Sequence, residues 1–102
     1  MISVIATIEL AEGRREEFLA IFGELTPKVQ AEEGCIEYAA WVDIPTSLGG
    51  QPPAREDVVV VIEKWQSVDA LEAHLMAPHM QQFRKATEDM RRRIELQILE
   101  RA

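Results

Sequence analysis

Apolar residues occupy every second position from Ile2 to Leu10, and polar residues separate most of them. A period of two predicts a strand with one buried face. Ile5 lies on the opposite face, which indicates that this second face is not fully exposed to water.

The apolar spacing becomes helical after Arg14. One face of the predicted helix carries Phe18, Ile21, Phe22, Leu25 and Val29. Pro27 lies inside this pattern and predicts a kink, or a break near Thr26. Gly34 follows at a position where a left-handed residue would end the helix.

A second strand is predicted from Cys35 to Asp43. Alternation places Ile36, Tyr38, Ala40 and Val42 on one face, and Cys35, Glu37, Ala39 and Trp41 on the other. The segment 44–57 is rich in proline and glycine and has almost nothing to bury, so it is a loop. It is either a mobile lid or a plain insertion. The insertion is favoured, because surface loops tolerate extra residues at small entropic cost.

Five consecutive β-branched residues, Val58 to Ile62, predict a strand that is buried on both faces and runs on to Trp65. Ser67 is then a suitable N-cap for a short helix over 68–75, because its hydroxyl can accept from a free backbone amide.

A longer helix is predicted from Pro78 to about Arg92, since proline fits the first turn of a helix. Its buried face carries Met80, Phe83, Thr87 and Met90. The basic run 91–93 is interpreted as the solvated end of this helix, suited to the negative pole of the helix dipole. Alternation from Ile94 to Leu99 predicts a last strand.

The element order is therefore strand, helix, strand, strand, helix, strand. This order predicts a single α+β domain over residues 1–102 with the ferredoxin-like fold, an antiparallel four-stranded sheet with helices on one face. Apolar candidates remain on the other face: Ile5, Val59 or its neighbours, and Leu99. We expect a homodimer that packs sheet on sheet, because a monomer would leave these residues in water.

Composition narrows the possible partners. The net charge of −7 argues against nucleic-acid binding, which needs a basic face. The single cysteine, Cys35, allows no intrachain disulfide and is interpreted as a structural thiol. We find neither a signal-peptide pattern nor an apolar run long enough for a membrane span, and we expect a cytoplasmic protein.

Both histidines fall in the second half of the chain. His74 is either a hydrogen-bonded imidazole at the edge of the core or a base or donor in a pocket, since histidine titrates near neutral pH. His79 lies five residues later, beyond Pro78, so the two do not form a metal pair on one helix face. No third ligand shows an obvious spacing, and we predict no metal site.

Other residues with possible chemistry lie on the strands. Glu63 follows an apolar run, and a carboxylate there must be paired, protonated or at an interface. Lys64 points to the opposite face and is not its partner. Trp65 and Trp41 are typical core or interface residues. Tyr38 could orient a phenolic or quinoid ligand through its hydroxyl.

Four motifs give these residues a context. They are Gly34-Cys35-Ile36-Glu37-Tyr38, Val61-Ile62-Glu63-Lys64-Trp65, Ala70-Leu71-Glu72-Ala73-His74-Leu75 and Ala77-Pro78-His79-Met80. The chain resembles the antibiotic biosynthesis monooxygenase family in these motifs, in the same element order over nearly its whole length.

The resemblance implies a dimeric α+β barrel in which a C-terminal strand reaches toward the partner, with a pocket between sheet and helices. It further implies a cofactor-independent monooxygenase or quinol oxidase that uses molecular oxygen on a small phenol or quinol, without flavin, metal or haem. By position, His74 would be the catalytic base or donor. The substrate-binding residues would be Tyr38, Trp65, His79, Phe83 and Glu63.

The chain also departs from its relatives. The loop over 44–57 is longer than usual, and Met80 replaces a common aromatic residue. Haem-degrading relatives place a ligating histidine where this chain has Arg84 or a neighbour, which argues against haem degradation. Two alternatives stay open, a non-oxidative isomerase and a non-catalytic ligand-binding dimer, because fold and family do not fix function.

Overall fold

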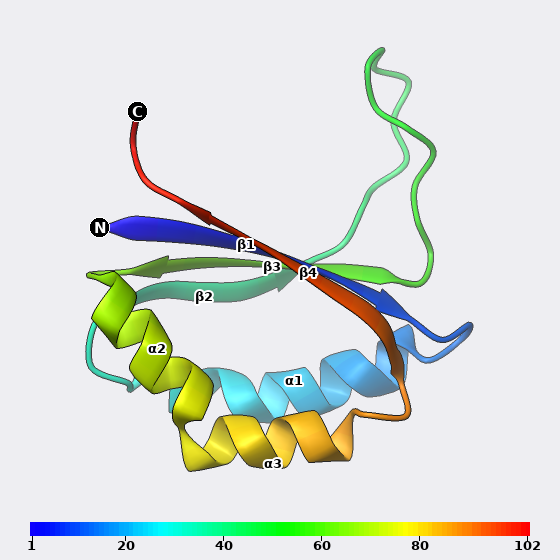
Figure 1. The fold of residues 1–102 in the computed structure, drawn as a ribbon. Coiled ribbons are helices and arrows are strands. Elements are labelled where there is room, and N and C mark those ends of the chain that lie inside the picture. Colours follow the sequence, from blue (N-terminus) through cyan, green and yellow to red (C-terminus); the bar gives the residue numbers. More distant parts are fainter.

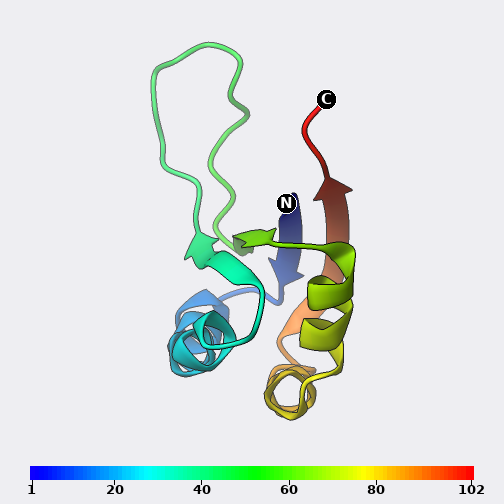
Figure 2. The ribbon, with the colours of Figure 1, turned by 90° about the vertical axis from the view of Figure 1, so that its left-hand side faces the viewer.

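The computed structural model describes residues 1–102 as a four-stranded antiparallel sheet with three helices on one face (Figures 1 and 2). In chain order the elements are β1 (Ile2–Leu10), α1 (Arg15–Gln30), β2 (Cys35–Trp41), β3 (Val58–Trp65), α2 (Val68–Met76), α3 (Pro78–Ala86) and β4 (Arg91–Leu99). The strands lie in the order β2-β3-β1-β4. The ferredoxin-like prediction is confirmed.

The core lies between the sheet and the helices. Val4, Ala6 and Ile8 of β1 face α1 and α3. On β3, their paired neighbours are Glu63, Val61 and Val59, respectively. Phe18 and Phe22 of α1 complete the layer, with Phe22 stacked on Tyr38 at a centroid distance of 5.3 Å. The two central strands therefore supply one wall of any pocket between the layers.

Helix α1 runs through Pro27 without the break that the sequence suggested near Thr26. Pro27 has no N–H to donate to the carbonyl four residues earlier. The hydroxyl of Thr26 instead donates to the carbonyl of Phe22 over 2.9 Å, so the neighbouring turn stays closed.

The segment after α3 also differs from the prediction. Helix α3 ends at Ala86, and the arginine run 91–93 opens strand β4 instead of ending a helix. Arg91 pairs with Leu10 of β1, while Arg93 pairs with Glu9 and faces solvent. The arginine run was assigned to the helix because it lacks the apolar alternation of a strand. An edge strand such as β4 does not need that alternation along its whole length.

A bulge in β2 changes the predicted faces of that strand. The register with β3 shifts between Cys35 and Glu37, so Cys35 packs against the core together with Tyr38, and Ile36 is half exposed. Gly34, just before the bulge, has φ +84°. A Cβ atom there would lie 2.6 Å from Cβ of Ala70, so this turn requires glycine to bring β2 against α2.

Strand β3 is fully buried on its inner face only. Val59 faces the helices and is inaccessible, whereas Val60 and Ile62 are partly exposed on the outer face. Ile62 lies in one row with Ile5 of β1 and Ala39 of β2. The apolar outer face predicted from sequence is thus present, with Val60 and Ile62 in the place of Val59.

The loop between β2 and β3 rises on the side of the sheet opposite the helices (Figures 1 and 2). Its base is fixed by Arg55, whose guanidinium makes two hydrogen bonds, of 2.8 and 3.0 Å, to the Asp43 carboxylate. This ion pair holds the pKa of Asp43 at about 2. The loop does not cover the space between the sheet and helices.

Candidate functional site

A cavity of about 320 Å³ lies between the sheet and the helices. Its lining residues come from every strand and all three helices: Ala6, Ile8, Phe22, Tyr38, Val61, Glu63, His74, Leu75, Met80, Phe83, Arg84, Arg91, Ile94 and Leu96. Ten of these are hydrophobic, and the polar ones are few. This volume is at the small end of the range of about 300–1,000 Å³ for small-molecule sites.

His74 is the most buried polar residue of the cavity wall, with 1% of its surface exposed. It lies in the last turn of α2, and its ring packs against Trp65 and Tyr38 at centroid distances of 4.7 and 5.5 Å. Burial lowers the pKa of His74, and the nearby Glu32 carboxylate partly opposes this effect. The lowered pKa favours the neutral imidazole, which is the form that can accept a proton.

Glu32 joins both histidines. Its Oε2 atom is 2.9 Å from Nδ1 of His74 and 2.7 Å from Nε2 of His79. A carboxylate only accepts, so Nδ1 of His74 carries the proton and Nε2 is left unprotonated. Sequence reasoning missed Glu32, because 42 residues separate it from His74. Its one signal was its position in the turn just before the Gly34 motif.

The same three residues could hold a metal ion. One ligand atom from each of Glu32, His74 and His79 lies within 4.8 Å of the others. Two imidazoles and a carboxylate suit zinc and other transition metals. The two histidines do not share a helix, as expected, yet the turn between α2 and α3 brings both to Glu32, the third candidate ligand that spacing did not show.

Glu63 also lines the cavity and is 6% exposed. Burial raises its pKa to about 6, against the opposing effect of a hydrogen bond from Trp65. Nε1 of Trp65 donates to Oε1 of Glu63 over 2.9 Å. The partner of Glu63 is thus Trp65 on its own strand. Lys64 pairs with Glu37 on the outer face, as its orientation predicted.

Tyr38 and Phe83 face the cavity as predicted. Tyr38 is 4% exposed, and burial raises the pKa of its hydroxyl. None of the side-chain hydrogen bonds of the chain uses this hydroxyl, so it is free to bond a ligand.

The structure places Trp65 and His79 outside the cavity wall. Trp65 lies behind His74 and Glu63, where it supports both. His79 lines a separate surface hollow between α1 and α3, and 22% of its side chain is exposed. Arg84 and Arg91 also line the cavity. Sequence reasoning did not assign them to it, and its one signal was that haem-degrading relatives place a ligand near the position of Arg84.

The chain is similar in sequence and in fold to several known proteins. It is 37% identical over 102 residues to the "Probable quinol monooxygenase YgiN" of Escherichia coli, covering 98% of this chain and 97% of that one. Among solved structures, PA3566 from Pseudomonas aeruginosa matches 99% of this chain and 93% of its own, with TM-score 0.81 and 27% identity.

A second structure, Rv0793 from Mycobacterium tuberculosis, has TM-score 0.80 at 22% identity over 99% of this chain and 94% of its own, which shows a shared fold. No helix of the structure has the length and apolar character to cross a membrane. The family model described as "Antibiotic biosynthesis monooxygenase" matches residues 1–86. The chain belongs to the antibiotic biosynthesis monooxygenase family.

Proposed function

We propose that the protein is a cofactor-independent monooxygenase or quinol oxidase that acts on a small phenol or quinol with molecular oxygen. The observation that carries the proposal is a buried imidazole at the wall of an apolar cavity, held by a carboxylate through Nδ1. The quinol monooxygenase name of the 37% identical relative agrees with it.

His74 acts as the base in this proposal. Glu32 occupies Nδ1, so Nε2 is the nitrogen that takes the proton from the substrate hydroxyl. The imidazolium that forms is stabilised by the adjacent Glu32 carboxylate, while the free hydroxyl of Tyr38 donates to a substrate oxygen and orients the ring. His79, on the far side of Glu32, is the exposed end of this hydrogen-bonded group.

Deprotonation gives an anion rich enough in electrons to reduce oxygen itself, so flavin, metal and haem are not needed. In the monooxygenase reaction one oxygen atom replaces a ring hydrogen and the other leaves as water, and the quinol supplies the two electrons as it becomes a hydroxyquinone. In the oxidase reaction the quinol gives two electrons and two protons to oxygen, with quinone and hydrogen peroxide as products.

The protein also forms a homodimer in the cytoplasm in this proposal. The outer face of the sheet supports the dimer, since Ile5, Val60 and Ile62 lie there together with Trp41 and Leu99, each of which is about half exposed. A second copy packed on this face would remove apolar surface from water and leave the cavity, on the opposite face, open to substrate.

Oxygen uptake tests the proposed reaction. Protein treated with a chelator is mixed with hydroquinones, naphthols and anthrones, and uptake is compared with the rate of autoxidation without protein. We expect uptake above that rate, reduced by about 10²–10⁴-fold in His74→Ala. Val68→Ala, a half-exposed position on the same helix, is the control and should keep full activity.

Three outcomes would contradict the proposal. No uptake across the panel would favour an isomerase or a ligand-binding protein on this fold. Unchanged uptake in His74→Ala would remove His74 from the mechanism. Oxygen uptake that the chelator-treated protein shows only after a divalent metal is added would indicate a metal centre. Glu32, His74 and His79 would then be its ligands, and His74 would not be the base.

A further inference from the structure

Two arginines line the cavity, and neither forms a salt bridge within the chain. Arg84 lies on α3 and Arg91 at the start of β4, both partly buried. The chain carries 18 acidic residues against 11 lysines and arginines, and Arg14, Arg55, Lys64 and Arg93 all have acidic partners. Arg84 and Arg91 are therefore two guanidiniums without a carboxylate partner, placed together at the wall of one apolar cavity.

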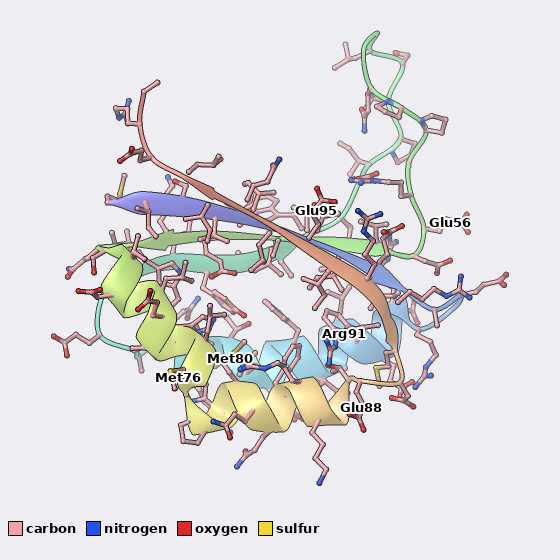
Figure 3. All side chains as sticks on the ribbon, in the orientation of Figure 1. Glu56, Met76, Met80, Glu88, Arg91 and Glu95 are labelled. Carbon is pink, nitrogen blue, oxygen red and sulfur yellow. The ribbon has the colours of Figure 1, made fainter.

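Hydrogen bonds to two carbonyl groups and one hydroxyl hold the two side chains in place. Arg91 donates from Nη2 to the carbonyl of Arg84 over 2.7 Å and from Nε to the hydroxyl of Thr87 over 3.1 Å. Arg84 donates from Nη2 to the carbonyl of Leu75 at the end of α2. Each guanidinium keeps N–H groups beyond these contacts, because arginine has five donors. Figure 3 shows Arg91 in the layer between the sheet and the helices.

The sheet register separates Arg91 from the groups that handle protons. Tyr38 pairs with Glu63, and Glu63 with Val4 of β1, whereas Arg91 pairs with Leu10 at the other end of β1. Tyr38, Glu63 and His74 therefore lie toward one end of the cavity and Arg91 toward the other. Arg84 lies between them, because its guanidinium donates to the carbonyl of Leu75, the residue after His74, and its own carbonyl accepts from Arg91.

We infer that the cavity selects aromatic ligands that carry an anionic group of the carboxylate class on the side away from the reacting hydroxyl. Arginine binds carboxylates through two parallel N–H bonds, and these bonds are strong where water is excluded. The apolar wall between the two ends takes the ring. The inference rests on the proposed function, which places the reacting hydroxyl of the ligand beside His74. It concerns the binding of the ligand and not the oxidation.

Matched naphthols test the inference by equilibrium binding in the absence of oxygen. The ligands are 6-hydroxy-2-naphthoate, its methyl ester and 2-naphthol, which share a ring system and a hydroxyl and differ in the charge at the far ring. We expect the acid to bind about tenfold more tightly than the ester, with a preference that falls as salt is added. Equal affinity of acid and ester would overturn the inference.

Variants assign the preference to the two arginines. In Arg84→Gln/Arg91→Gln the acid and the ester should bind equally, while 2-naphthol keeps its affinity. Arg93→Gln, on the outer face of β4, is the control and should keep the whole preference. A preference that survives in the double variant would also overturn the inference.

Folding is checked separately, because Arg91 holds the start of β4. The single variant Arg84→Gln and the charge-preserving Arg91→Lys keep the test valid if the double variant unfolds: the first should lose part of the preference and the second should retain most of it. Oxygen uptake is measured in parallel. A clear acid preference without uptake would leave this inference standing and contradict the proposed reaction.

Discussion

Nδ1 of His74 lies 2.9 Å from Oε2 of Glu32, across 42 residues of sequence. The contact joins the last turn of α2 to the turn that follows α1, and it fixes which imidazole nitrogen carries the proton. The His74 side chain is 1% exposed, and Glu32 is the group that bonds its Nδ1 atom in the folded chain. The base of the proposed reaction thus depends on a residue that does not line the cavity.

Replacing Glu32 should change the pH dependence of the reaction as well as its rate. The carboxylate raises the pKa of His74 by hydrogen bond and charge, in opposition to burial. In Glu32→Ala we expect kcat to fall by about 10–100-fold and the acidic limb of the pH–rate profile to move to lower pH. Glu33→Ala, an exposed neighbour, is the control. An unmoved acidic limb would show that Glu32 supports the fold alone.

Glu63→Gln should stabilise the protein above pH 6. The folded pKa of Glu63 is about 6, against 4.5 for a free side chain, so the native state binds an extra proton between these values and loses stability as the pH rises through them. A neutral amide avoids this loss and can still accept from Trp65. The variant should match the wild type at pH 4 and exceed it by about 2 kcal/mol in unfolding free energy at pH 8.

Urea unfolding across this pH range makes the measurement, with Glu37→Gln on the outer face as the control. A constant difference between Glu63→Gln and the wild type at every pH would show that Glu63 does not titrate in the folded state as described.

Two glycine substitutions should act in opposite directions. Gly34→Ala places a side chain at φ +84° and a Cβ atom 2.6 Å from that of Ala70, so we expect a loss of about 1–3 kcal/mol. Gly23→Ala lies within α1 with nothing near its Cβ position, and should stabilise the protein by up to about 1 kcal/mol. Chemical denaturation of both variants provides the comparison. Equal effects would mean that the turn at Gly34 rearranges freely.

The proposed dimer should depend on the outer face of the sheet. Ile62→Glu introduces a charge in the middle of this face, beside Ile5 and Ala39, and should give a monomer by light scattering. Val68→Glu, at a half-exposed position on the helix side, should leave the mass unchanged. A dimer that persists in Ile62→Glu would place the contact elsewhere.

The sequence predicted the fold through periodicity, because β1 and β3 each keep a buried side and α1 keeps one apolar stripe. The prediction of the last helix was wrong at its end, because the first residues of β4, from Arg91, are polar and show no apolar alternation. Of the residues that sequence reasoning proposed for the site, His74, Tyr38, Phe83 and Glu63 line the cavity, whereas His79 lines a separate surface hollow. It missed Glu32, because a single hydrogen bond between distant turns leaves no periodic trace, and it placed Trp65 in the pocket when the indole lies one layer behind.

The double hydrogen bond between Arg55 and Asp43 closes the long loop at its base, and Asp57 continues the closure by accepting from the backbone N–H groups of Leu10 and Gly13. These contacts fix the two ends of the loop, so the length of the segment between Asp43 and Arg55 does not affect how the loop is attached to the sheet. The exposed tip near Gly49 is therefore a suitable site for a short peptide tag or a fluorophore, which would lie on the side of the sheet away from the cavity and outside the strands that line it.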